Sequence, residues 1–399
     1  MTHRGRVVLV LAVVTYVSAW AFGSRPLYPV ALGLLFASAV SWAWVRLAAK
    51  PVRLRRAVAN RDYFEGDDVP VELELELTSA VLPASATVVD RIGKLGERRA
   101  TAGRAGRRLW VRYVLEALPR GRYVFERTEL EIGDAFGLDR ATILLPEPRA
   151  VLVYPHLVQV DRLFTEAGAH AHDGRRVLLR RPSGFDLHSV REYEHGESLR
   201  RVHWRSTARR GQLMVKELED APRDEVAVLL DAERAVLSPE GFDVLVRAAG
   251  SILHAHVRRG RRVALVVNDE THATQRIRSD GGDWRRALEV LAAVEQTGTR
   301  GAVTLLGAEG TAASRALELV VVTARLVPEL VQRLVQRAVS HHAVSVVWID
   351  AASFNGGGPQ REPALLRLQA GGVPVAVVRR GDDLAARLAA QEIAKAAGA

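Results

Sequence analysis

Residues 226–231 read VAVLLD, five apolar residues followed by an aspartate, and residues 263–269 read VALVVND in the same manner. Continuous apolar runs without polar alternation are typical of strands in a parallel sheet that is covered on both faces. Further runs of this kind, and the helical stretches between them, predict a doubly wound α/β domain over residues 221–399. The expected strands are 226–230, 263–267, 319–323, 344–349 and 373–378, and the expected helices are 239–259, 283–296, 328–340 and 382–396.

Polar residues follow the ends of these strands, where the ligand crevice of such a sheet lies. They are Asp231, Asn268, Asp269, Thr323 and Asp350. The sequence contains no G-x-x-x-x-G-K-[ST] loop and no G-x-G-x-x-G after a strand, which excludes the simplest nucleotide sites. G-x-S-x-G and H-E-x-x-H are absent as well, which excludes the simplest hydrolases.

Upstream, residues 57–160 change to short alternating runs such as VPVELELEL at 69–77. A period of two indicates strands with one wet face, and several of them within about 100 residues predict an antiparallel β-sandwich. The other expected strands are 86–90, 109–115, 122–130 and 151–154. The segment Ile132–Leu138 is interpreted as a loop that tucks Phe136 and Leu138 under the sheet.

The N-terminus holds two uncharged apolar runs, residues 7–22 and 27–45, separated by the turn-prone sequence GSRP. Their lengths predict a transmembrane helical hairpin in contact with lipid, and Trp20, Trp42 and Trp44 stand near its ends, where indole rings favour the interface. Two alternatives stay open: a signal sequence cleaved near Ala19-Trp20-Ala21, and two buried core helices.

The charge distribution predicts topology. The chain of 399 residues has a formal net charge of +10, but residues 1–56 carry eight basic residues and no acidic one, which leaves 48 basic against 46 acidic residues in the rest. Only Arg25 lies between the two apolar runs. The positive-inside rule therefore places both termini and the soluble body on the cytoplasmic side of the inner membrane. A nearly neutral body does not suggest a nucleic-acid ligand, and the lack of cysteine excludes disulfides and thiolate chemistry.

Residues 184–220 form the most distinctive stretch, GFDLHSVREYEHGESLRRVHWRSTARRGQLMVKELED. Ser198 as N-cap and Gly211 as stop predict a helix over 199–210, on which Arg201, Arg205 and Arg209 share one face. One interpretation is an internal ion-pair network with Glu192, Glu194 and Glu197. The other is a docking surface for an acidic partner, because arginine forks suit carboxylates.

At these residues the chain resembles the domain-of-unknown-function fifty-eight (DUF58) family of membrane-anchored proteins. The resemblance rests on fixed spacings through Gly184, Val190-Arg191-Glu192-Tyr193, Gly196-Glu197, Arg200-Arg201-Val202-His203-Trp204, Ala208-Arg209, Leu213-Met214-Val215-Lys216 and Glu219. Glu197 stands where the family usually has Asp. The residues we take as motif or docking candidates are Arg191, Tyr193, Gly196, Glu197, Arg201, Trp204, Arg205 and Arg209.

The resemblance implies a multidomain chain: a two-helix membrane anchor (1–56), a β-sandwich (57–160), a linker with the motif (161–220) and a von Willebrand factor A-like α/β domain (221–399). It also implies a non-enzymatic scaffold that partners a MoxR-type AAA+ ATPase in the assembly or maturation of membrane or cell-envelope proteins. An alternative is a hydrolase or transferase that uses Asp231, Asp269 or Asp350 with Arg205 or Arg209 on an anionic substrate.

Asp231 occupies the first position of the metal motif D-x-S-x-S that von Willebrand factor A domains use. Here the sequence is Asp231-Ala232-Glu233-Arg234-Ala235, so both hydroxyl ligands are missing. We therefore expect no metal and no cofactor, and we expect Asp231 to act as a cap or to pair with a neighbouring arginine.

Overall fold

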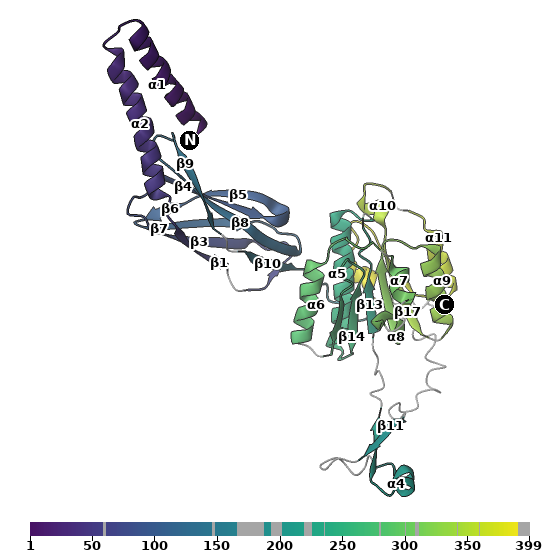
Figure 1. The fold of residues 1–399 in the computed structure, drawn as a ribbon. Coiled ribbons are helices and arrows are strands. Elements are labelled where there is room, and N and C mark those ends of the chain that lie inside the picture. The colour runs from purple at the N-terminus through teal and green to yellow at the C-terminus, as the bar shows by residue number, and fades with distance from the viewer. Residues whose placement is uncertain are drawn as a thin grey trace. The chain divides into compact units, whose positions relative to one another are not determined.

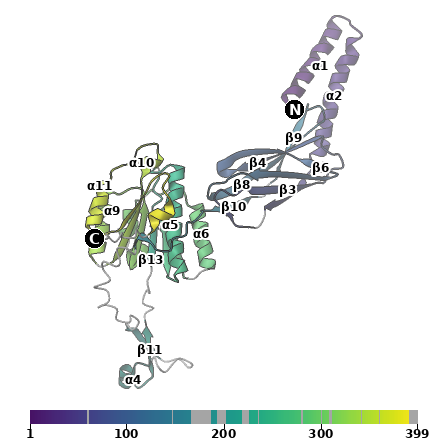
Figure 2. The same cartoon turned by 180° about the vertical axis from the view of Figure 1, so that it is seen from behind.

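The computed structural model describes residues 1–58, 61–145, 148–165, 187–192, 202–218, 226–234, 236–278, 281–299, 301–307, 311–340, 342–358 and 360–389. The chain divides into two compact units, Met1–Tyr154 and Pro155–Ala399 (Figures 1 and 2). The described parts of the tract at 161–220, which we expected to be a linker, belong to the second unit.

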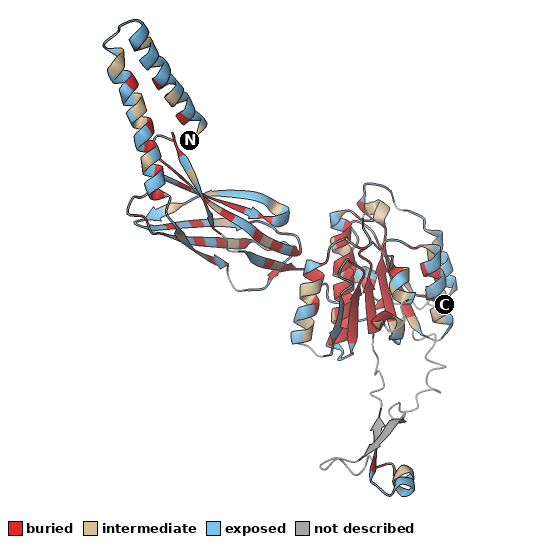
Figure 3. Cartoon of the chain, in the orientation of Figure 1, coloured by how far each residue is buried: buried red, intermediate tan, exposed pale blue. Residues whose placement is uncertain are grey.

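The first unit begins with two long helices, α1 (His3–Ala21) and α2 (Leu27–Ala48), which pack against each other. The side chain of Thr2 caps α1 by accepting a hydrogen bond from the Gly5 amide (3.1 Å). Both helices are long and apolar enough to span a membrane. Most of their surface is exposed (Figure 3), which argues against the alternative of two buried core helices.

Two sheets complete the first unit. One has the strand order β1-β3-β7-β6, and the other has the order β2-β10-β8-β4-β5 with β9 also paired to β8. The strands are β1 (Val52–Val58), β2 (Tyr63–Phe64), β3 (Val69–Leu77), β4 (Ser85–Ile92), β5 (Gly96–Thr101), β6 (Gly103–Ala105), β7 (Arg108–Leu115), β8 (Gly121–Gly133), β9 (Arg140–Leu145) and β10 (Arg149–Tyr154), with a 3-10 turn η1 (Gly93–Leu95).

The alternating runs form strands with one buried face, as the sequence predicts. In β3, residues 69, 71, 73, 75 and 77 are buried, and they share one hydrophobic cluster with Val88, Leu130 and Val153 of the second sheet. Strand β1 begins in the segment that we assigned to the anchor, since its pairing with β3 starts at Val52 and runs to Val58. The sheet therefore begins before the expected boundary at residue 56.

Arg56 is buried in this unit, although we counted it among the charges that flank the membrane. Its Nη2 lies 2.8 Å from Asp90 Oδ1, and its guanidinium group lies over the ring of Phe125, 3.9 Å from the centroid. The basic flank after the hairpin therefore consists of the four exposed residues Arg46, Lys50, Arg53 and Arg55, which still outnumber Arg25 in the hairpin turn.

The loop after β8 corrects one expectation. Leu138 is buried, but Phe136 is 70% exposed instead of lying under the sheet. The carboxylate of Asp134 accepts hydrogen bonds from the backbone amides of Phe136 (2.9 Å) and Asp139 (2.8 Å). These bonds close a tight turn, and the Phe136 side chain is left in contact with solvent.

The second unit contains a sheet with the order β15-β14-β13-β16-β17-β18, which is parallel except for the antiparallel edge strand β15. In sequence order this is the arrangement 3-2-1-4-5-6. The strands are β13 (Val226–Leu230), β14 (Val263–Val267), β15 (Thr274–Ile277), β16 (Glu318–Thr323), β17 (Ala343–Ile349) and β18 (Val375–Val378).

Helices cover both faces of this sheet, so the strands are buried on both sides (Figure 3). One face packs against α5 (Pro239–Arg258), α6 (Gly282–Ala293), α10 (Ala351–Phe354) and α12 (Leu384–Leu388), and the other against α7 (Ala302–Gly307), α8 (Ala312–Arg315), α9 (Pro328–Val339) and α11 (Pro363–Ala370). Leu163 and Phe164 are buried in the hydrophobic core on the α5 side of the sheet, so core residues extend into the tract that we expected to be a linker.

Candidate functional site

The DUF58-like motif lies on a small element of the second unit, formed by β11 (Leu187–Glu192), α4 (Trp204–Arg210) and β12 (Met214–Leu218). Strands β11 and β12 pair in antiparallel register. The helix is shorter than the predicted range 199–210, because the amide of His203 donates to the carbonyl of Met214 (2.7 Å) and the His203 side chain caps the helix instead. Its end at Gly211, in left-handed conformation with φ 71°, is as predicted.

The surface of α4 combines one aromatic residue with cations. Trp204 is 68% exposed, and Arg205, Arg209 and Arg210 are also exposed. Arg205 and Arg209 are four residues apart on the same helix, so like charges face each other there. The exposed surface of α4 therefore presents an indole ring beside guanidinium groups, and among the described residues neither Arg205 nor Arg209 makes an ion pair.

The other motif residues are placed only in part. Arg191 lies in β11 opposite Val215, while Tyr193, Gly196, Glu197 and Arg201 lie outside the described residues. The three-arginine stripe is therefore established only for Arg205 and Arg209. The internal ion-pair network stays a prediction, because Glu194 and Glu197 also lie outside.

The second candidate is Asp231, directly after β13. It lies where β13 neighbours β16, the point at which the strand order reverses and at which open α/β sheets bind ligands. Its carboxylate accepts hydrogen bonds from Asn268 Nδ2 (2.8 Å) and Thr323 Oγ1 (2.6 Å). We expected Asp231 to act as a cap or to pair with a neighbouring arginine. Its carboxylate also accepts a hydrogen bond from the backbone amide of Glu233, as a cap would. Among the described residues it bonds an amide and a hydroxyl from adjacent strand ends, and no arginine pair is present.

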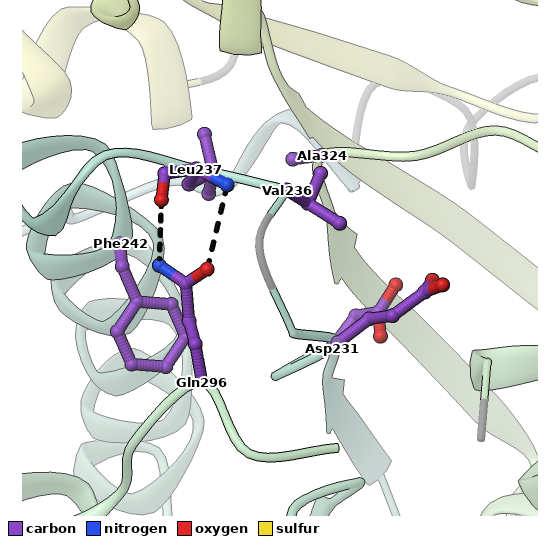
Figure 4. A pocket seen from close by; sticks show the side chains of 7 residues that line it. Asp231, Val236, Leu237, Phe242, Gln296 and Ala324 are labelled. Carbon is purple, nitrogen blue, oxygen red and sulfur yellow. Dashed lines mark hydrogen bonds between the residues drawn. The ribbon is translucent and has the colours of Figure 1, made fainter. Parts of the chain in front are cut away.

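Burial raises the pKa of Asp231 to about 6, and the nearby Glu233 carboxylate adds to the effect, while the hydrogen bond from Thr323 opposes it. The recess beside Asp231 is too narrow to hold a water-sized sphere. The side chain of Gln296 closes one side of it by bonding both the amide (3.4 Å) and the carbonyl (3.1 Å) of Leu237 (Figure 4). No motif predicts this bridge, since Gln296 stands at the end of a predicted helix and belongs to no recognisable pattern.

The loop after Asp231 uses its polar residues for ion pairs. Glu233 pairs with Arg325 (2.6 Å) and Arg234 with Glu270 (3.4 Å). These residues stand in the loop where a D-x-S-x-S motif would offer hydroxyl groups. Among the described residues, no group of three or more metal-ligating side chains is gathered in one place.

The other two aspartates named for an enzymatic alternative have partners of their own. The Asp269 carboxylate accepts from the hydroxyl (2.6 Å) and amide (3.0 Å) of Thr271, within its own turn. Fully buried Asp350 accepts from the Gln360 amide (3.1 Å) and lies 3.3 Å from Arg379 Nε. Asp231, Asp269 and Asp350 therefore end their strands as predicted, but each is held in a separate set of contacts.

Residues 189–354 match the model of the family described as "Protein of unknown function DUF58". We call this matched stretch, residues 189–354, the DUF58 region. This DUF58 region runs from within β11 to the end of α10, so it contains both α4 and the Asp231 recess.

The DUF58 region is also where a curated relative aligns. The chain is 29% identical over 163 residues to the uncharacterized protein YeaD of Bacillus subtilis. This alignment covers 40% of this chain and 39% of YeaD. The alignment thus spans well under half of that relative.

Two solved structures give weaker matches. They are the DNA glycosylase AlkC of Pseudomonas fluorescens bound to DNA with an abasic site analog (15% identity, 33% of this chain and 42% of that chain, TM-score 0.16) and Cwp6 from Clostridium difficile (9% identity, 82% and 37%, TM-score 0.15). TM-scores this low carry no information about fold or function.

Proposed function

We propose that this chain is a membrane-anchored adaptor without enzymatic activity, whose soluble body faces the cytoplasm and docks a MoxR-type AAA+ ATPase. Its role would lie in the assembly or maturation of membrane or cell-envelope proteins. The observation that carries the proposal is the α4 surface in the DUF58 region, where exposed Trp204 stands beside Arg205 and Arg209. Tryptophan and arginine are enriched among the residues that dominate protein–protein binding energy.

The architecture supports an adaptor role for both units. The strand order 3-2-1-4-5-6 with an antiparallel edge strand is the arrangement we expect for a von Willebrand factor A-like domain, and the two sheets around one core fit a β-sandwich. The two positions that would supply hydroxyl ligands to a metal in a von Willebrand factor A-like domain hold Glu233, which pairs with Arg325, and Ala235. In this proposal the domain therefore recognises its partner through side chains and not through a bound metal.

The test is a pull-down of the full-length tagged chain from native membranes, with mass spectrometry to identify a MoxR-type ATPase. The Trp204→Ala variant should lose at least tenfold in recovered ATPase, because the removed ring contributes about 2 kcal/mol or more to a typical hot spot. Trp110→Ala is the matched control, since Trp110 is an exposed tryptophan (57%) on β7 in the other unit. Equal losses in both variants, or no AAA+ ATPase with the unmodified chain, would contradict the proposal.

One observation favours the enzymatic alternative. Asp231 lies at the switch point of the sheet with a pKa raised to about 6, and shifted carboxylates gather at active sites. If the chain were such an enzyme, Asp231→Asn would abolish its function in cells and leave ATPase recovery unchanged. The adaptor proposal predicts the opposite ranking, with Trp204→Ala more harmful than Asp231→Asn.

A further inference from the structure

The loop that follows β8, residues 134–139, fastens the two helices of the hairpin to the sheets. Its Asp134 carboxylate accepts a hydrogen bond from the hydroxyl of Ser41 in α2 (2.9 Å). The carbonyls of Gly137 and Leu138 accept from the Thr2 hydroxyl (2.7 Å) and the Thr2 amide (3.0 Å) at the start of α1. All of these contacts lie within the first compact unit, so the position of the loop along the hairpin is fixed.

Gly5 shows how closely the loop approaches α1. A Cβ atom at Gly5 would lie 2.0 Å from the carbonyl oxygen of Leu138, so only glycine lets this turn of the helix meet the loop backbone. Asp134 and Asp139 are nearly fully buried in the contact, and the ammonium group of Met1 lies 2.5 Å from Asp139 Oδ1. The polar groups of the loop are thus turned inward, and Phe136 is the large apolar side chain that it exposes.

Helix geometry gives the depth of the loop. Ser41 lies fourteen residues after Leu27, which is about 21 Å along α2 from the hairpin turn, and Gly5 lies sixteen residues before Ala21, about 24 Å along α1. The hydrocarbon core of a bilayer is about 30 Å thick, and about 40 to 45 Å with the headgroup regions. If the hairpin turn reaches the far interface, the loop lies at the near boundary between acyl chains and headgroups.

The surroundings of the loop have the composition of that boundary. Trp42 and Trp44 are exposed on α2 at this level, and the Trp44 indole donates to the carbonyl of Leu82 (3.0 Å). Exposed Arg4 and Arg6 on the first turns of α1 can extend their guanidinium groups toward headgroups. Aromatic rings are enriched at this depth, with basic residues on the cytoplasmic side.

We propose that the loop 134–139 is a third membrane contact of this chain, in which Phe136 inserts its ring into the bilayer at the acyl–headgroup boundary. The loop thereby sets the depth of the hairpin and holds the sheets of the first unit against the membrane surface. This inference rests on the membrane anchoring proposed above, but it concerns a segment that begins 86 residues after the end of α2.

The lack of native cysteine gives a direct test. Full-length Phe136→Cys, reconstituted in phospholipid nanodiscs and labelled with a nitroxide, would be compared by electron paramagnetic resonance with Leu32→Cys in α2 and Phe64→Cys in β2. Phe64 is the matched control, because it is an exposed phenylalanine of the same unit. The register of β2, β10 and β8 places it at the end of β8 opposite to the loop, about 40 Å away along that 13-residue strand.

The label at residue 136 should collide more often with oxygen than with a water-soluble nickel chelate, as the label at residue 32 should, whereas the label at residue 64 should show the reverse. If the label at residue 136 behaves like the label at residue 64 while the label at residue 32 reports lipid, the proposed loop contact is wrong and the membrane anchoring is still supported. If all three positions report water, the membrane anchoring itself is wrong.

Discussion

At the scale of single residues, Asp231 makes the sharpest prediction. Its pKa is raised from 3.8 to about 6 in the folded chain, so between these values the folded state binds more protons than the unfolded state. Burial of the charged carboxylate therefore costs stability above pH 6, and this cost disappears as the pH falls toward 4. Asp231→Asn removes the charge. As the pH rises from 4 to 8, the free energy of unfolding of the variant should therefore increase relative to that of wild type by up to about 3 kcal/mol.

Hydrogen exchange of β13 in the full-length chain measures this difference as a change in opening free energy. Asp382→Asn is a suitable control, because the pKa of Asp382 is lowered by hydrogen bonds from Arg387 and Arg379 that outweigh its burial. Its pH dependence should have the opposite sign. If the difference in opening free energy between wild type and Asp231→Asn does not change with pH, the pKa of Asp231 is not raised in the folded chain.

The sequence located Asp231 at a strand end, but it could not identify the partners of the carboxylate. Strand periodicity places Asn268 and Thr323 at the same sheet edge, whereas the choice between these groups and a nearby arginine depends on side-chain rotamers. The same limit explains Phe136. Two apolar residues in a short loop suggest burial, and the backbone bonds to Asp134 that turn Phe136 outward leave no trace in hydropathy.

At the scale of elements, a buried polar network joins the two sheets of the first unit. Arg56 of β1 and Tyr113 of β7 belong to one sheet, and both bond Asp90 of β4 in the other, with Thr128 of β8 as a further donor to Asp90 (2.5 Å). Burial and the Asp90 carboxylate raise the pKa of Tyr113, which keeps its hydroxyl protonated as a donor. No motif marked this network, because each member is a polar residue in an alternating strand.

Removing one charge of this network should cost more than removing both. Arg56→Ala leaves the Asp90 carboxylate buried without its cation, which typically costs about 3 to 5 kcal/mol, while the double variant Arg56→Met/Asp90→Leu should lie within a few kcal/mol of wild type. Hydrogen exchange of β4 and β8 reports the result. If the double variant is as unstable as Arg56→Ala, the network contributes specific bonds and not merely charge compensation.

Elements with a clear hydropathy pattern, either a continuous apolar run or strict alternation, were predicted closely, and those set by tertiary contacts were not. Strands β13 and β14 agree with their predicted ranges at both ends, and β3 does so too. Helices α8 and α10 have four residues each and were missed, because one turn has too little periodicity to detect. Helix α4 was predicted too long. The amide of His203 donates to the carbonyl of Met214 in β12, and the His203 side chain caps the helix, which begins at Trp204.

At the scale of the whole molecule, the burial of Arg56 leaves the predicted topology in place. Four exposed basic residues after α2, together with Arg4 and Arg6 before the hairpin, still outweigh Arg25 in the turn. We therefore expect Ser24→Cys to react with a membrane-impermeant maleimide added to intact cells. Leu366→Cys, an exposed site on α11, should react only after the cells are opened. Because the native chain has no cysteine, each variant reports one position. Labelling of Leu366→Cys in intact cells would contradict the predicted topology. A mass of the purified chain that lacks the first 21 residues would support the signal-sequence alternative.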